Sequence, residues 1–156
     1  MSIAPVVATV EVQATPARAF ALFTDRMGDW WVGGTVGSKP YVAIVVEPQV
    51  DGRWYERDAD GAEAQWGKVL LWEPPTRIIL GWQLDSNFRY DSMMLTEVEL
   101  TFTALDGGGT RVRLEHRNLE RYGSDGARVA GLVDSGWAKQ LGGFGSFAEQ
   151  QETVHG

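Results

Sequence analysis

Two side chains of this 156-residue sequence are placed for proton transfer, His116 and Glu56. His116 follows Val112 and Leu114 at alternating positions, which puts it on the apolar face of a predicted strand. An imidazole there could act as a general acid or base, or orient a ligand; the structural alternative is a strand-end histidine hydrogen-bonded to a neighbour. Glu56 shares a strand face with Trp54, where an enclosed carboxylate could transfer a proton or simply pair with an arginine.

The sequence lacks the residues and motifs that cysteine chemistry, metal sites and nucleotide binding require. The chain has no cysteine, which excludes disulfides, thiolate metal sites, iron–sulfur clusters and a cysteine nucleophile. It has no phosphate-binding loop, no dinucleotide fingerprint, no histidine pair with metal-ligand spacing and no nucleophile elbow. Asp58-Ala59-Asp60-Gly61 starts like a calcium loop, but its glycine comes too early and the closing glutamate is missing. The sequence therefore predicts no cofactor and no metal.

Tryptophan is unusually frequent, with seven residues in the chain. Such a surplus indicates either a heavy core or an aromatic-lined pocket. Trp66, Trp72 and Trp82 fall on neighbouring predicted strands. They could form an aromatic clamp for a planar or sterol-like ligand, or they could belong to the core. Trp30 and Trp31, at the end of a predicted short helix, are expected to be exposed at a pocket entrance or a protein interface.

The charge balance limits the possible partners. With 14 basic and 21 acidic residues the net charge is −7, which argues against binding to nucleic acid. No run approaches the roughly 18–20 apolar residues of a membrane span, so no membrane insertion is expected. The first five residues lack the features of a signal peptide. A cytoplasmic protein is expected.

The elements that must position these residues can be read from hydrophobic spacing. Alternation over residues 5–14 predicts a half-buried strand. Thr15-Pro16 supplies an N-cap followed by proline at the first helical position, which predicts a helix over Pro16–Phe23. A second short helix, capped by Thr24 or Asp25, follows it.

The rest of the chain reads as strands and then one helix. Apolar spacing becomes helical from about Val129 to Gln151. The predicted fold class is α+β: a curved seven-stranded antiparallel sheet around a long C-terminal helix, with two short helices after the first strand. We expect a single domain over 1–156 with a core of about 5–150. The six later strands are predicted at Tyr41–Glu47, Arg53–Asp58, Ala64–Glu73, Arg77–Asp85, Thr96–Ala104 and Thr110–Arg117.

A single helix is too narrow to fill the concave face of such a sheet, so an aromatic-lined cavity is predicted between them. Its polar groups are expected to be His116, Tyr90 and Glu56. The glycine-rich stretch Tyr122–Ser135 is the predicted gate. The predicted ligand-binding residues are Trp54, Leu80, Trp82, Tyr90, Phe102, Leu114, His116, Trp137, Leu141 and Phe144.

Several stretches carry a resemblance to a known family: residues 10–20, Val50–Glu56, Gly67–Leu70 followed by Glu73–Trp82, and Gly136-Trp137. They are similar to the helix-grip (START-like, SRPBCC) superfamily and, within it, to homologues of the activator of the heat-shock-protein-90 ATPase. The resemblance implies a β-α-α-β6-α fold around an apolar cavity. It names no ligand, because the superfamily includes lipid and hormone carriers, polyketide cyclases and aromatases, and co-chaperone modules.

The final helix departs from the family's regularly spaced leucines, since it contains Gly142, Gly143 and Gly145. Each glycine costs a helix about 1 kcal/mol relative to alanine. These residues therefore either allow close approach to the sheet or mark a kink.

Three functions remain open from the sequence. The first is binding of an apolar or aromatic small molecule, by a monomer or a homodimer. The second is a cyclase-, aromatase- or hydrolase-like enzyme that uses His116 or Glu56 in the same cavity. The third is a co-chaperone-like module that binds a protein partner through an exposed patch at Trp30 and Trp31.

Overall fold

The computed structural model describes residues 2–155, with side chains described for residues 2–151. Strand β1 (Val6–Val12) leads into helices α1 (Pro16–Asp25) and α2 (Met27–Trp30). Six strands and a short 3-10 helix, η1 (Leu119–Asp125), separate these from the long helix α3 (Gly126–His155). The six strands are β2 (Tyr41–Val46), β3 (Arg53–Asp58), β4 (Glu63–Glu73), β5 (Arg77–Trp82), β6 (Thr96–Ala104) and β7 (Thr110–Arg117).

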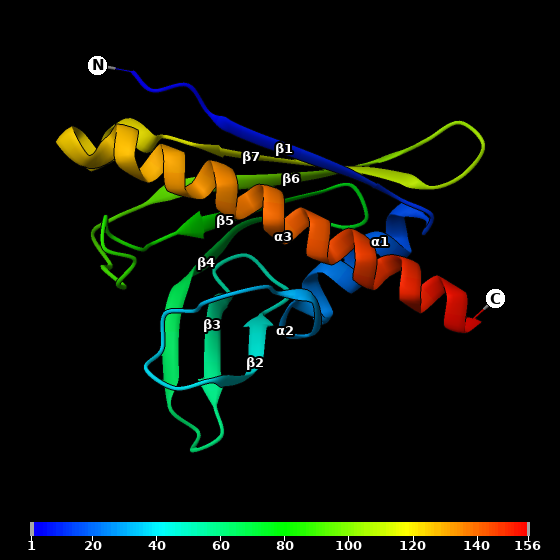
Figure 1. The fold of residues 1–156 in the computed structure, drawn as a ribbon, viewed down its shortest axis with the longest axis horizontal. Coiled ribbons are helices and arrows are strands. Elements are labelled where there is room, and N and C mark those ends of the chain that lie inside the picture. Colours follow the sequence, from blue (N-terminus) through cyan, green and yellow to red (C-terminus); the bar gives the residue numbers. More distant parts are fainter. Residues whose placement is uncertain (1, 156) are drawn as a thin grey trace.

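All seven strands form one antiparallel sheet in the order β1-β7-β6-β5-β4-β3-β2. Six of them follow one another as a meander, and β1 closes the far edge by pairing with β7. Figure 1 shows the sheet curving, with α3 lying across its concave side. The predicted helix-grip architecture is confirmed.

The sheet register explains how the core face is assembled. In β6 and β7, Leu100 lies opposite Leu114 and Val98 opposite His116, and all four side chains are buried. The alternate residues of both strands are charged or polar and face outward, as expected for an antiparallel sheet covered on one side. On the outer face Arg117 pairs with Glu97 at 2.9 Å and with Glu99 at 2.6 Å.

Local signals account for the first two helices only in part. The Thr15 hydroxyl accepts a hydrogen bond from the Arg18 backbone N–H, and Pro16 is the first residue of α1, as predicted. The predicted cap of the second helix is wrong. Thr24 is still inside α1 and its hydroxyl donates to the Phe20 carbonyl, while Arg26 precedes α2 without a side-chain cap.

Helix α3 runs without interruption through its glycines, which favours close approach, and not a kink, of the two alternatives that the sequence left open. A Cβ on Gly143 would come within 2.4 Å of Val32 Cγ2 and 3.0 Å of the Trp30 carbonyl oxygen. A Cβ on Gly145 would lie 2.9 Å from Val10 Cγ2, whereas one on Gly142 would meet nothing within 4 Å. Two of the three glycines therefore let the helix approach the rest of the fold closely.

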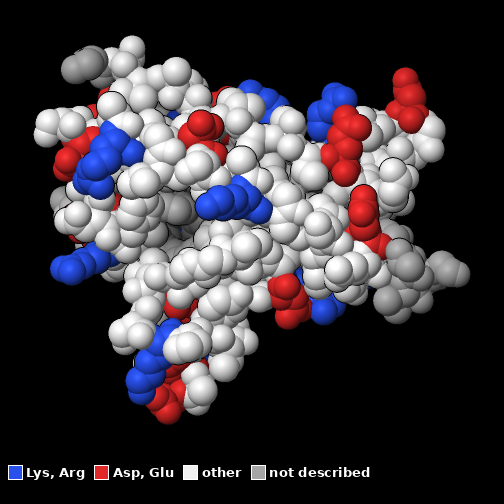
Figure 2. Space-filling view, in the orientation of Figure 1, with Lys and Arg blue, Asp and Glu red and all other residues white. Residues whose placement is uncertain are grey.

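The surface carries both signs of charge. On the face shown in Figure 2, acidic and basic side chains are interspersed, without a broad area of one sign. Among the described residues, no helix has the length and apolar character needed to cross a membrane.

Candidate functional site

A pocket of about 350 Å³ opens between the N-terminal half of α3, strands β4 and β5, and the segment that joins α2 to β2. We call this segment, residues 31–40, the joining segment. In Figure 1 this joining segment loops in front of β3 and β4. Most of the pocket wall is aromatic or aliphatic. The lining residues are Trp31, Gly34, Thr35, Val36, Trp66, Trp82, Leu84, Phe88, Leu132, Val133, Gly136, Trp137 and Gln140.

The pocket wall is built from indole rings in mutual contact. The Trp31 ring centroid lies 4.8 Å from that of Trp66 and 5.9 Å from that of Trp137. Trp82 lies 5.6 Å from Trp137 and 6.4 Å from Phe88, in both cases edge to face. These separations are typical of favourable aromatic pairs, so the rings support one another while leaving a space between them.

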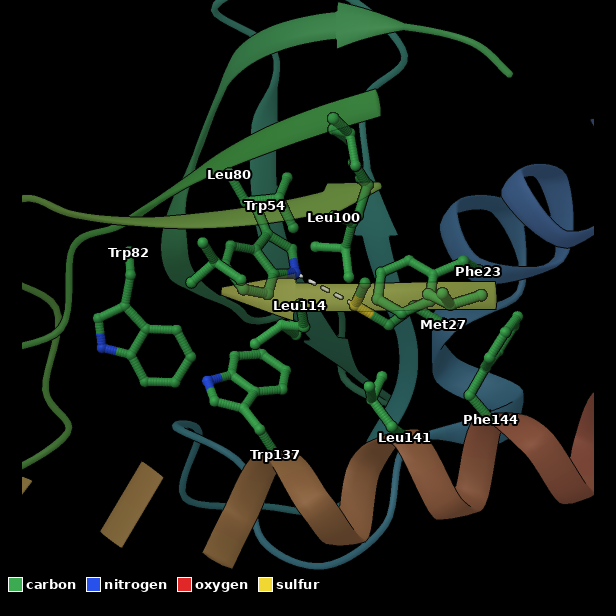
Figure 3. Packing of buried hydrophobic residues seen from close by; sticks show 14 of the residues in the cluster. Phe23, Met27, Trp54, Leu80, Trp82, Leu100, Leu114, Trp137, Leu141 and Phe144 are labelled. Atoms are coloured by element: carbon green, nitrogen blue, oxygen red, sulfur yellow. Dashed lines mark hydrogen bonds between the residues drawn. The ribbon is translucent and has the colours of Figure 1, made fainter. Parts of the chain in front are cut away.

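Of the predicted ligand-binding residues, Trp82 and Trp137 line this pocket. Figure 3 shows them side by side at one end of the interior, with Phe144 at the other end. Tyr90 is 42% exposed on the connection between β5 and β6 and lies outside the pocket wall. The other apolar residues predicted to bind a ligand belong to the packed core: Trp54, Leu80, Phe102, Leu114, Leu141 and Phe144.

The core residues are enclosed because α1 and α2 fill their end of the interior. Phe23 from α1 packs edge to face against Phe144 at 5.2 Å and against Phe102 at 5.9 Å. Trp54 donates its indole N–H to the sulfur of Met27 in α2 (Figure 3). Side chains from the short helices therefore fill this end of the interior.

Sequence reasoning missed most of the pocket wall. The sequence does not distinguish core from pocket for Trp66 and Trp72. In the structure Trp66 lines the pocket, whereas Trp72 packs against Phe20 with ring centroids 5.1 Å apart. Trp31 was expected near an entrance and does line the pocket. Gln140 carries no sequence signal, because a polar residue on a long helix is ordinarily exposed.

Trp30 corrects the expectation of an exposed tryptophan pair. Its side chain is 3% exposed, and its indole N–H donates to the Phe23 carbonyl oxygen. The apolar patch that was to mark a protein interface at Trp30 and Trp31 is therefore not present, since one ring is in the core and the other faces the pocket.

His116 lies behind the pocket wall rather than in it. The Trp137 indole, which can only donate, gives its N–H to His116 Nδ1 at 3.1 Å. The neutral ring then carries its proton on Nε2, which lies 2.8 Å from the Thr96 hydroxyl. Burial lowers the pKa of His116 to about 3, so the imidazole is neutral near pH 7. In this arrangement His116 orients Trp137, and both of its nitrogens are occupied.

Tyr122 extends this buried group of polar side chains. Its hydroxyl donates to the Leu84 carbonyl oxygen at 2.7 Å, and burial raises its pKa to about 12. Leu84 itself lines the pocket. The hydrogen bonds of His116 and Tyr122 thus fix the wall from behind, at Trp137 and at Leu84.

Glu56 is 2% exposed and has no arginine partner among the described residues. Its Oε1 accepts hydrogen bonds from the Trp66 indole N–H at 2.8 Å and from the Val36 backbone N–H at 2.6 Å. Both donors belong to residues that line the pocket. Glu56 therefore holds one strand and the joining segment together from outside the pocket.

The joining segment has a second attachment on α3. The Gln140 side-chain amide accepts from the Val32 N–H at 2.9 Å and donates to the Val32 carbonyl oxygen. The Trp31 indole N–H donates to the Gly34 carbonyl oxygen at 3.2 Å. Residues 32–36 are thus held by a buried side chain at each end.

Comparison with known proteins decides the family. The model of the family described as activator of Hsp90 ATPase homolog 1-like protein matches residues 13–149. The chain belongs to this family. A comparison with the curated proteins gives no match.

Solved structures of related folds agree with this assignment. An anthrahydroquino-gamma-pyrone synthase, Txn09, is 34% identical, with a TM-score of 0.65 over 93% of this chain and 97% of that one. The self-sacrificing resistance protein CalC from Micromonospora echinospora is 29% identical, with a TM-score of 0.72 over 95% of this chain and 96% of that one. Protein MLL2253 from Mesorhizobium loti shares the fold at 19% identity, with a TM-score of 0.69 over 94% and 97%.

The structure corrects the predicted position of the gate. The stretch Tyr122–Ser135 is not a flexible connection, because Gly126–Ser135 forms the first turns of α3. Irregular segments do line the pocket elsewhere, between α2 and β2 (Trp31, Gly34, Thr35 and Val36) and between β5 and β6 (Leu84 and Phe88). Within the described part of the chain, no cluster of three or more His, Asp or Glu side chains could hold a metal ion.

Proposed function

We propose that this protein binds a planar aromatic small molecule in the pocket beneath the N-terminal half of α3. The observation that carries the proposal is the set of five aromatic side chains, Trp31, Trp66, Trp82, Phe88 and Trp137, around an open space. At about 350 Å³ this space is within the range of small-molecule sites, which begins near 300 Å³. The faces and edges of the indole rings favour stacking with a flat aromatic ring system over contact with a flexible aliphatic chain.

Few polar groups are available to orient such a ligand. The Gln140 amide is occupied by the backbone of Val32, and Thr35 contributes a hydroxyl. Affinity would therefore come from buried apolar area, at about 25 cal/mol per Å², with one or two polar contacts for orientation. The family's fold is compatible with a ligand between helix and sheet, and the name of the 34% identical synthase denotes a fused aromatic product.

Quenching of tryptophan emission by a water-soluble anthraquinone sulfonate tests this proposal. We expect saturable quenching that a fatty acid such as dodecanoate does not reproduce. Phe88→Ala should weaken binding about tenfold, because Phe88 lines the pocket. Tyr90→Ala, two residues away and outside the wall, is the matched control and should bind like the parent protein. Absence of saturation for any planar aromatic probe would exclude the proposal.

A second candidate is a cyclase that closes a ring on a bound aromatic precursor, which is favoured by the 34% identity to a synthase over 93% of the chain. Confinement of a flexible precursor in a reactive conformation can accelerate ring closure without a covalent bond between the precursor and the protein. A role in holding the wall is supported for His116 by its contacts with Trp137 and Thr96, and for Glu56 by the hydrogen bond from Trp66 to Oε1.

The cyclase reading can be tested with an o-hydroxyaryl 1,3-diketone. Attack of the phenol oxygen on the far ketone and loss of one water give a chromone, whose absorbance reports the reaction. Unchanged turnover in the His116→Ala, Glu56→Ala double variant would remove both residues from any acid–base role. No acceleration over buffer by the parent protein would remove the enzyme reading altogether.

A further inference from the structure

A second, polar pocket of about 200 Å³ lies on the other side of the joining segment. Gly34, Thr35 and Val36 line the aromatic pocket, and the next three residues of the chain line this one. Its wall comes from the joining segment and from strands β3 and β4: Gly37, Ser38, Lys39, Glu56, Asp58, Ala62, Glu63 and Ala64. The two pockets are therefore neighbours that share one wall.

Glu56 connects the two pockets through its two oxygens. Oε1 faces the shared wall, where it accepts from Trp66 and Val36. Oε2 faces the polar pocket, since a Cβ placed on Gly37 would lie 2.8 Å from it. Among the described residues the hydrogen bonds to Glu56 reach Oε1 alone. The residue as a whole is 2% exposed, and Oε2 is not fully buried, so it is open to the polar pocket.

The other charges of the pocket do not neutralise Glu56. Lys39, the one cation of the wall, pairs through Nζ with Asp60 at 2.5 Å. Glu63 pairs with Arg53, and Asp58 accepts from two backbone N–H groups of its own turn. A buried carboxylate is stable when its charge is matched and its oxygens are hydrogen-bonded. Among the described residues no side chain of this wall donates to Oε2 of Glu56, so that oxygen is left to a molecule in the pocket.

We propose that the polar pocket binds an organic ammonium group, with Glu56 Oε2 as its counter-ion. An ammonium group supplies the missing positive charge and the missing hydrogen-bond donors together. A metal ion is not favoured, because the described residues offer no group of three or more ligands able to hold one. This site goes beyond the aromatic pocket and stands without it.

The experiment follows the indole N–H signal of Trp66 by NMR during titration with n-propylammonium chloride. Because Trp66 donates to Glu56 Oε1, a cation on Oε2 should shift that signal saturably. Sodium chloride at equal ionic strength and n-propanol, which has the same shape without the charge, should not. An equal shift with n-propanol, or no saturable shift with n-propylammonium, would overturn the proposal from measurements on the parent protein alone.

Glu56→Gln removes the charge and keeps an amide oxygen for Trp66 and Val36. It should weaken n-propylammonium binding at least tenfold. Glu73→Gln, which removes an exposed charge that pairs with Arg77 outside the pocket, is the matched control and should change binding less than twofold. Unchanged binding by Glu56→Gln would contradict the assignment.

The ammonium group could belong to a free amine or to a side arm of the aromatic ligand. Adding an aminopropyl arm to the anthraquinone probe separates these sources. If the arm increases affinity in the parent protein and not in Glu56→Gln, one ligand spans both pockets; if it adds nothing while n-propylammonium still binds, the site takes a free amine. Because the unarmed aromatic probe is read by emission, failure of the aromatic proposal remains distinguishable from failure of this one.

Discussion

The two ends of the space under α3 are built from the same helix and the same sheet, yet one is filled and the other is open. At the C-terminal end, Phe144 meets Phe23 and Trp30 at ring distances of 5.2 and 5.5 Å. At the N-terminal end, Trp137 contacts Trp31 and Trp82 edge to face, and the three rings line the open pocket. The difference comes from α1 and α2, which reach only the filled end. A cavity in this fold thus depends on what the short helices leave uncovered.

The largest expected effect is on the filled end. Phe144→Ala removes a fully buried ring, and we expect a loss of about 3–5 kcal/mol in the free energy of unfolding, measured with urea. Phe88→Ala, at the open end, should cost less than about 1 kcal/mol, because its ring is only partly buried. Similar losses from both substitutions would erase the distinction between the two ends.

Two adjacent glycines sharpen the comparison. Gly143→Ala should destabilise the protein by about 1–3 kcal/mol, because its Cβ would meet Val32 and the Trp30 carbonyl. Gly142→Ala, with open space around its Cβ, should stabilise it by up to about 1 kcal/mol through helix propensity. Thermal unfolding of both variants gives the comparison, and a gain from Gly143→Ala would show that the helix does not approach closely there.

Lowering the pH should reduce the free energy of unfolding through His116, which lies behind the wall of the open end. In the unfolded chain this imidazole takes up a proton near pH 6.5, whereas burial keeps it neutral in the folded protein down to about pH 3. Its contribution to stability is therefore complete above pH 6.5 and is lost as the pH falls below that value. Between pH 6.5 and 5.5 the parent protein should lose about 1 kcal/mol that His116→Gln does not lose. Parallel stability curves for the two proteins would place the imidazole in contact with water.

The smallest expected effect on stability comes from the pocket rim. Leu132 is 47% exposed, so Leu132→Ala should change the free energy of unfolding by less than about 0.5 kcal/mol. It should nevertheless weaken binding of the anthraquinone probe severalfold, since Leu132 lines the pocket. Lys139→Ala, also on the exposed side of α3 but outside the wall, is the control for both measurements.

The fold could be predicted from the sequence almost completely, and the site only in part. Strands Thr96–Ala104 and Thr110–Arg117 were predicted with their observed bounds, because alternation is a local signal. Trp137 and Phe144 fall on the same apolar stripe of α3, so their spacing cannot distinguish a pocket wall from core. What separates them is the side chain opposite each one, which is set by the packing of α1 and α2.

The Gln140 amide imitates a neighbouring β-strand. By accepting from one backbone N–H and donating to the carbonyl of the same residue, it gives Val32 the pair of bonds that one rung of an antiparallel ladder would give. The joining segment is thus attached to Gln140 of α3 by the two hydrogen bonds of Val32. Because the Val32 amide donates to Gln140, its exchange with solvent deuterium would report the free energy needed to open this one attachment.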